Sequence, residues 1–339
     1  MITVIDKRQG DGEILAENCA PILLLGFNRP GLLEGLVAIL SKARPPKIYL
    51  AVDGPRPDRP DEAGKCAECA AVMDTPGWPC EVRKLIRAEN LGCKRAVEEA
   101  LDWFFSQEDE GIILEDDCWP DISFLRYATE LLERYRTNSR VGIVSGDNFY
   151  GFTTDQKASY RFSRHVHIWG WATWARVWHA YRANPKEFDQ TMDYVFKTGF
   201  FTSRGRKLAM KFWSDYLKRP DTWDVPFALW LHGHGSLTTM PKCNLVANLG
   251  GGNASGATHT RGFSYDEYLF ARSVSLHFPL EHPMEIKCDI DADHHHEQRS
   301  HAWLPRLLTL GGILLGEIGR KIAKVARGIE NVAPTLFRI

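Results

Sequence analysis

Four short apolar runs, separated by helical patterns, most constrain the fold of this chain. The runs occupy residues 21–26, 47–52, 82–86 and 111–114. Between the first two, leucine and isoleucine recur at helical spacing over residues 31–41. Continuous apolar runs of this length are typical of parallel strands that are buried on both faces. The alternation therefore predicts an α/β domain, with a mostly parallel central sheet and helices on both faces.

Polar residues stand directly after these predicted strands. Arg29 follows the first strand, Asp53 follows the second, and Asn90 opens the helix that follows the third. The fourth strand runs into an acidic triplet, residues 115–117, which consists of Glu115, Asp116 and Asp117. Because ligands of parallel sheets bind at the carboxyl ends of the strands, these side chains form a candidate site.

The acidic triplet is the strongest chemical signal. Three adjacent carboxylates repel one another, and a hard divalent cation such as Mg²⁺ or Mn²⁺ would offset that cost, because it prefers carboxylate oxygens. Such a cation could in turn neutralise a diphosphate. The alternative interpretation is a solvated acidic turn after a buried strand.

The neighbouring residues point to an anion. The guanidinium of Arg29 is suited to bidentate contact with phosphate, and a surface salt bridge is the alternative. Asn90 opens a helix whose N-terminus favours anions, and Lys94 and Arg95 add positive charge there. Asn90 as a plain helix cap, and Asp53 as the cap of an Asp-Gly-Pro turn, remain open alternatives.

The ordered motifs resemble the GT-A fold glycosyltransferases. A Glu-Asp-Asp triplet after a strand resembles the metal-binding motif of the N-acetylglucosaminyltransferase I group, and residues 169–174 and 257–260 resemble segments of bacterial glycosyltransferase 2-like proteins. The resemblance covers roughly residues 21–282. The further segments that fall in the expected order are residues 26–29, 53–54, 90–92, 170–171 and 223–224.

The resemblance implies roles for the nucleotide-sugar half of the site. Asp117 would be the direct ligand of Mn²⁺ or Mg²⁺, Asp116 would reach the ribose or a metal-bound water, and Glu115 would lie near the nucleotide sugar. Asp53 would bind the base of the nucleotide. His259, in a glycine-rich loop, would be a second metal ligand.

The acceptor half is predicted from the second part of the chain. An inverting transferase needs one general base, and the resemblance implies Asp224 in a Trp-Asp segment, with Asp215 and Asp221 as nearby rivals. Trp171 and Trp174 are candidates for the floor of the acceptor site, with a place in the core as the alternative.

The predicted organisation is one catalytic domain with a short extension before it and a tail after it. The tail contains a basic amphipathic pattern that is too short and too charged to cross a bilayer. It suggests peripheral contact with a membrane surface, or packing on the domain or a second subunit. The acidic and histidine-rich run 289–296 is interpreted as a loop. The boundaries are 1–20 for the extension, 21–120 and 121–282 for the two halves of the domain, 283–339 for the tail and 303–329 for the amphipathic segment.

Composition excludes little else. Lys and Arg (42) balance Asp and Glu (43), so no basic field indicates nucleic acid. Eight cysteines without a second paired motif, and a polar N-terminus, favour reduced thiols and a cytoplasmic location, with the inner membrane face as a peripheral site.

The resemblance implies a metal-dependent, inverting hexosyl- or N-acetylhexosaminyltransferase that uses a nucleotide sugar, most often UDP-linked. Its acceptor would be a hydroxyl of a lipid-linked glycan or a surface polysaccharide. The alternatives are a sugar-phosphate nucleotidyltransferase and a non-catalytic carbohydrate-binding protein. A nucleotidyltransferase would carry a glycine-rich loop at residues 26–30, where this chain has Gly-Phe-Asn-Arg-Pro.

Overall fold

The computed structural model describes residues 18–184, 221–250 and 272–300, together with residues 207, 210, 214 and 218. His259, Asp215 and the amphipathic segment 303–329 lie outside these ranges. The chain divides into two units after Glu297. The first unit ends at Glu297, and the domain boundary at residue 282 stays a prediction.

The predicted parallel half of the sheet is confirmed. Its strands are β1 (Ile22–Gly26), β2 (Lys47–Val52), β3 (Glu81–Ile86) and β4 (Glu110–Glu115), in the spatial order β3-β2-β1-β4. Leu24 lies beside Leu50 on one side and Leu114 on the other, and all three are fully buried. The apolar runs are continuous because both faces of these strands are covered.

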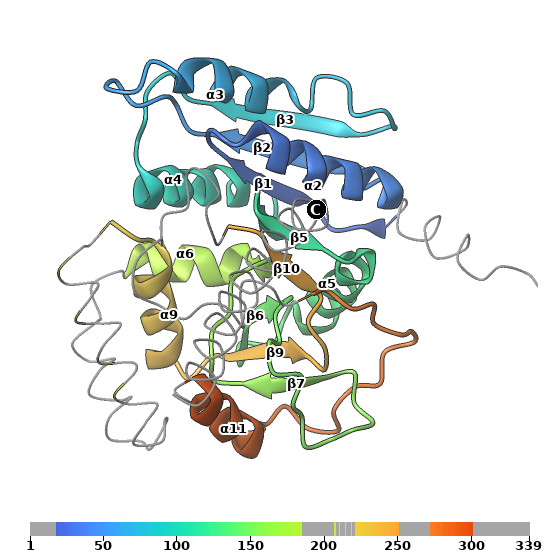
Figure 1. The fold of residues 1–339 in the computed structure, drawn as a ribbon. Coiled ribbons are helices and arrows are strands. Elements are labelled where there is room, and N and C mark those ends of the chain that lie inside the picture. Colours follow the sequence, from blue (N-terminus) through green and yellow to red (C-terminus); the bar gives the residue numbers. More distant parts are fainter. Residues whose placement is uncertain are drawn as a thin grey trace, which may run out of the picture. The chain divides into compact units, whose positions relative to one another are not determined.

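Helices cover both faces of this half, as predicted (Figure 1). The connections through α2 (Pro30–Ala43) and α3 (Glu62–Ala71) step from β1 to β3 in one direction, whereas α4 (Cys93–Phe105) returns the chain to β4. Right-handed crossovers place helices of opposite step on opposite faces. In agreement, α2 packs beside α3, while α4 packs beside α6 (Ala175–Ala183).

The second half of the sheet is mixed. β6 (Val141–Ser145) lies parallel to β9 (Leu237–Pro241), while β7 (Tyr160–Ser163) is antiparallel to β9 at the edge. The aromatic stretch after residue 168 forms β8 (Trp171–Trp174), an antiparallel strand between β4 and β6. Both β4 and β6 therefore end at the same edge of the sheet.

A small second sheet lies beside this edge. β5 (Cys118–Pro120) pairs antiparallel with β10 (Val246–Asn248), so Ala247 lies opposite Trp119. β9 ends at Pro241, and the chain leaves the large sheet before β10 pairs with the residues that follow the acidic triplet.

Trp171 and Trp174 are core residues and not the exposed floor predicted for an acceptor site. Each is 1 % exposed. The Trp171 ring stacks on Trp223 with centroids 5.6 Å apart, and the Trp174 indole donates a hydrogen bond to the Leu132 carbonyl at 3.0 Å. Because neighbouring side chains cover their faces, these rings fix β8 between β4 and β6.

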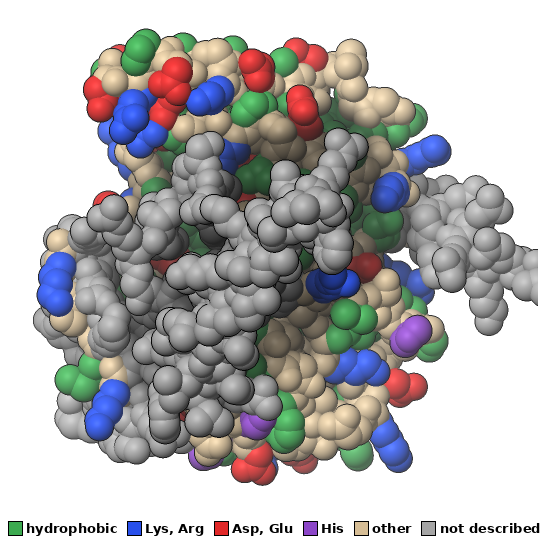
Figure 2. Space-filling view, viewed as in Figure 1, with side chains coloured by type: hydrophobic (Ala, Val, Ile, Leu, Met, Phe, Trp, Pro, Cys, Tyr) green, Lys and Arg blue, Asp and Glu red, His purple; other side chains and the backbone are tan. Residues whose placement is uncertain are grey.

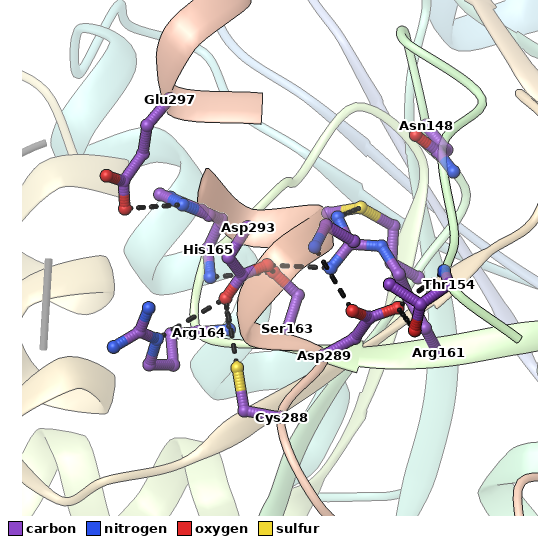
Figure 3. Close-up of polar contacts among 12 residues, drawn as sticks. Asn148, Thr154, Arg161, Ser163, Arg164, His165, Cys288, Asp289, Asp293 and Glu297 are labelled. Atoms are coloured by element: carbon purple, nitrogen blue, oxygen red, sulfur yellow. Dashed lines mark hydrogen bonds and ion pairs between the residues drawn. The ribbon is translucent and has the colours of Figure 1, made fainter. Parts of the chain in front are cut away.

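The run predicted as a loop at residues 289–296 is largely helix α11 (Ile290–Ser300), which packs against β7 (Figure 3). Asp293 is fully buried there. One of its oxygens accepts hydrogen bonds from Arg161 and Ser163, both at 2.6 Å, and the other accepts from the Arg164 backbone at 2.9 Å. The buried face of α11 is polar, so the apolar periodicity that reveals most helices is missing.

Replacing Asp293 is expected to destabilise the domain strongly. Asp293→Ala leaves the Arg161 guanidinium, 4 % exposed, without its carboxylate. Breaking a buried ion pair from one side costs about 3–5 kcal/mol. Urea unfolding measures the loss, and Asp291→Ala, at an exposed position on the same helix, is the control. Equal stability of the two variants would contradict the expectation.

Candidate active site at the carboxyl ends of the parallel strands

The acidic triplet sits where β4 leaves the large sheet. Glu115 is the last residue of β4, and the Asp116 backbone N–H still bonds the Leu25 carbonyl of β1 at 3.0 Å. The Trp119 indole then donates to the Asp116 carbonyl at 3.1 Å as the chain turns into β5. Asp116 and Asp117 are 2 % and 8 % exposed. The alternative interpretation of the triplet as a solvated acidic turn is therefore wrong.

Arg29 binds both aspartates. Its Nε lies 3.0 Å from Asp116 Oδ2, its Nη1 lies 2.9 Å from Asp117 Oδ2, and its Nη2 contacts Asp116 Oδ1. Burial raises the pKa of Asp116 to about 6, although the charge of Arg29 acts in the opposite direction. Arg29, in the loop after β1, therefore neutralises both carboxylates and does not form a surface salt bridge. The contact of Arg29 with phosphate stays a prediction.

Asp224 lies within electrostatic reach of the triplet. Burial raises the pKa of Glu115 to about 8, and the charges of Asp117, Asp116 and Asp224 add to the effect. Asp224 is the first residue of α9 (Asp224–Gly233) and accepts a hydrogen bond from the Thr222 hydroxyl. The fold therefore brings together acids that are about a hundred residues apart in the sequence.

Asp53, directly after β2, binds the loop that connects β3 to α4. Its carboxylate accepts hydrogen bonds from the Gly54 and Leu91 backbone, each at 3.0 Å, and from the Asn90 side chain at 2.9 Å. The approach is close, since a Cβ on Gly54 would lie 2.4 Å from the Glu89 backbone. Both Asp53 oxygens are thus engaged by the chain, and the base contact predicted for Asp53 stays a prediction.

The other predicted residues of this region lie on the first turn of α4. The Arg95 side chain is 69 % exposed and pairs with Glu99 one turn later, with 2.7 Å between Nε and Oε1. Lys94 is partly buried. Asn90 bonds Asp53 and the Gly54 carbonyl, so it fixes the loop and does not cap the helix through its side chain.

The role of Asp117 as a metal ligand stays a prediction, which its surroundings allow. Among the described residues, no three His, Cys, Asp or Glu side chains are arranged to hold a metal by themselves. Mg²⁺ is commonly bound by only one or two carboxylates, with substrate phosphates completing the shell. Asp117 already accepts Cys118 Sγ on one oxygen, at 3.5 Å, and Arg29 on the other, and each oxygen keeps one lone pair. The donor set fits a hard ion shared with a diphosphate.

The backbone of Gly250 packs directly against this carboxylate. A Cβ at Gly250 would lie 2.2 Å from Asp117 Oδ2, and the Leu249 N–H bonds the Asp117 carbonyl at 2.8 Å. His259, the second predicted metal ligand, lies in the following segment and outside the described residues. The end of β10 thus sets the position of the Asp117 side chain.

Gly250→Ala is expected to weaken metal binding. The added methyl group must displace the Asp117 carboxylate, and loss of the contacts that orient a ligand lowers metal affinity about tenfold or more. Titration calorimetry with Mn²⁺ in the presence of UDP measures the change. Gly31→Ala is the control, because its Cβ would meet no atom within 4 Å. Equal Mn²⁺ affinity in both variants would contradict this role for Gly250.

One residue of this edge escaped the sequence prediction. Asp147 follows β6 by two residues and is 1 % exposed. A Ser-Gly-Asp-Asn segment after an apolar strand is the same signal that identified Asp53, so the pattern was present. That β6 ends at the same edge as β4 depends on the pairing of both strands with β8, which the sequence pattern does not show.

Comparison with known proteins adds little. No family model matches the chain, and no curated protein matches its sequence. Among solved structures, HddC from Yersinia pseudotuberculosis, complexed with GMP-PN, is similar over 46 % of this chain and 77 % of its own, with 14 % identity and a TM-score of 0.29. So weak a likeness carries no argument about the activity.

Two further observations concern partners. No helix in the described part of the chain combines the length and apolar character needed to cross a bilayer. On the face drawn in Figure 2, acidic and basic side chains are interspersed over the described residues of the upper part of the view, and no continuous basic patch gathers there.

Proposed function

We propose that this protein is a metal-dependent, inverting glycosyltransferase of the GT-A fold. It moves a sugar from a nucleotide sugar, most often a UDP-sugar in the group it resembles, to a hydroxyl of a glycan or lipid-linked acceptor. The observation that carries the proposal is the convergence of the acidic triplet, Arg29 and Asp224 at the carboxyl edge of the sheet.

The residues divide the work by position. A divalent metal bound at Asp117 would neutralise the diphosphate leaving group as a Lewis acid. Arg29 is already held beside Asp117, so its guanidinium can follow a phosphate that enters next to the metal. Asp116 is fixed by Arg29 and buried, which favours a role in holding that arginine in place as well as in reaching the ribose.

Asp224 is the proposed general base. Its carboxylate stands at the first residue of α9 and near Glu115. It would take the proton of the acceptor hydroxyl, whose oxygen then bonds the anomeric carbon as the nucleoside diphosphate leaves on the opposite face. One base and one displacement give inversion.

A sugar-phosphate nucleotidyltransferase remains the second candidate, because it would use the same edge and a metal-binding carboxylate. The structure differs from that expectation at one point: the loop after β1 is short, and α2 begins at Pro30, directly after Arg29. No glycine-rich phosphate loop fits between them.

One screen separates the candidates. The protein is incubated with Mn²⁺ and a panel of UDP-, GDP- and dTDP-sugars, and release of the nucleoside diphosphate is measured. In parallel, nucleoside triphosphates and sugar 1-phosphates are supplied and pyrophosphate is measured. The proposal expects diphosphate release from one donor class. Pyrophosphate release would favour the nucleotidyltransferase, and UDP binding without any turnover would favour a carbohydrate-binding protein.

A further inference from the structure

A second polar pair lies on the same edge of the sheet as the acidic triplet. Trp171 of β8 pairs with Ile113 of β4 on one side and with Ser145 of β6 on the other. Glu115 ends β4 and Asp147 follows β6, each two residues beyond these partners, and β4 and β6 run in the same direction. They therefore lie at the same level of the sheet, two strand spacings or about 10 Å apart. Asp147 belongs to residues 121–282, the half of the domain that is predicted to bind the acceptor.

Asp147 and His167 carry unused hydrogen-bonding capacity. Asp147 Oδ2 accepts the Trp169 backbone N–H at 3.2 Å, while its buried Oδ1 has no hydrogen-bond partner among the residues that the structure describes. The buried Nδ1 of His167 also has none, and it lies 3.9 Å from Asp147 Oδ2. Buried polar atoms of this kind are rare in folded proteins and call for an explanation.

A single oxygen atom beside the two side chains can bridge them. A distance of 3.9 Å is too long for a hydrogen bond, but one oxygen can lie about 2.8 Å from both atoms. A hydroxyl is suited to this position, because it donates to a carboxylate and accepts from an imidazole N–H. A bridging water would contact the same two atoms, Asp147 Oδ2 and His167 Nδ1.

An aromatic wall stands beside the pair. The Phe149 ring stacks on the His167 ring with centroids 5.3 Å apart, and Trp169 meets Phe149 edge-on at 5.1 Å. The His167 side chain keeps 10 % of its surface exposed. Apolar rings next to a few convergent polar groups are typical of a small-molecule site, and a sugar offers both an apolar face and hydroxyls.

We propose that Asp147 and His167 bind one hydroxyl of the acceptor sugar and so position it for transfer. The proposal rests on the proposed function, in which the acceptor enters from this half of the domain. Asp147 and His167 are positioning and specificity-determining residues here, and the proton of the reacting hydroxyl still goes to Asp224.

The test uses simple glycosides as probes. Methyl α- and β-glycosides of glucose, galactose, mannose and N-acetylglucosamine are titrated by NMR into the full-length protein, with and without UDP and Mn²⁺. At least one glycoside is expected to bind the wild type. Asp147→Asn and His167→Gln are expected to weaken that binding about tenfold or more, because a buried partner is left unsatisfied, while UDP affinity stays within about twofold.

Controls separate the outcomes. Asp155→Asn, at an exposed position in the following loop, should bind the glycoside as the wild type does. Glycoside binding that is absent in the wild type, or unchanged in both pair variants, overturns the proposal; lower thermal stability with unchanged binding would identify a structural water only. If the proposed function is wrong, UDP will not bind in the presence of Mn²⁺. Glycoside binding measured without UDP still tests the roles of Asp147 and His167.

Discussion

Asp117→Asn is expected to lower donor turnover by about 10³-fold or more. A metal ion contributes several kcal/mol of stabilisation to a departing charge, and each 1.4 kcal/mol corresponds to about tenfold in rate. Asparagine keeps the shape of the side chain but not the charge that holds the metal. The measurement is release of nucleoside diphosphate, together with Mn²⁺ titration calorimetry.

The control for Asp117→Asn is Asp58→Asn, whose side chain is 78 % exposed and lies outside the site. Because Asp117 also binds Arg29, thermal unfolding is measured on both variants to show that the domain remains folded. A folded Asp117→Asn protein that keeps Mn²⁺ affinity and turnover within a few-fold of the wild type would rule out Asp117 as the metal ligand.

Asp224→Asn is expected to reduce transfer by about 10²–10⁴-fold, the usual contribution of a positioned general base. Donor binding should be unchanged, because Asp224 is assigned to the acceptor hydroxyl and not to the nucleotide. The two variants are therefore distinguishable. Asp224→Asn should lose turnover but keep its affinity for UDP and Mn²⁺, whereas Asp117→Asn should lose both turnover and Mn²⁺ affinity.

Asp221→Asn is the matched control for this prediction. Asp221 lies three residues earlier, carries the same charge and is exposed. If Asp221→Asn loses turnover and Asp224→Asn does not, the base assignment moves to Asp221. Near wild-type transfer in both variants would reject a base in this segment.

Whether each element could be predicted from the sequence depends on the kind of residue that it buries. β1 to β4 were predictable because both faces of a parallel strand are buried, which makes the strand uniformly apolar. Helix α11 was not, because its buried face carries Asp293, whose charge is balanced by Arg161 from β7, more than a hundred residues away. Trp171 and Trp174 were ambiguous because an aromatic residue serves equally in a core and at a sugar site.

The sequence by itself determined the α/β class and the carboxylates at the end of β4, because strand burial and local charge are properties of short segments. Only the tertiary structure decided which distant groups face those carboxylates. Arg29 reaches Asp116 across the edge between β1 and β4, and Asp147 comes level with Glu115 through pairing with β8. Such neighbours depend on strand order and register. Both are set by packing between segments that are far apart in the sequence, and no local sequence pattern encodes them.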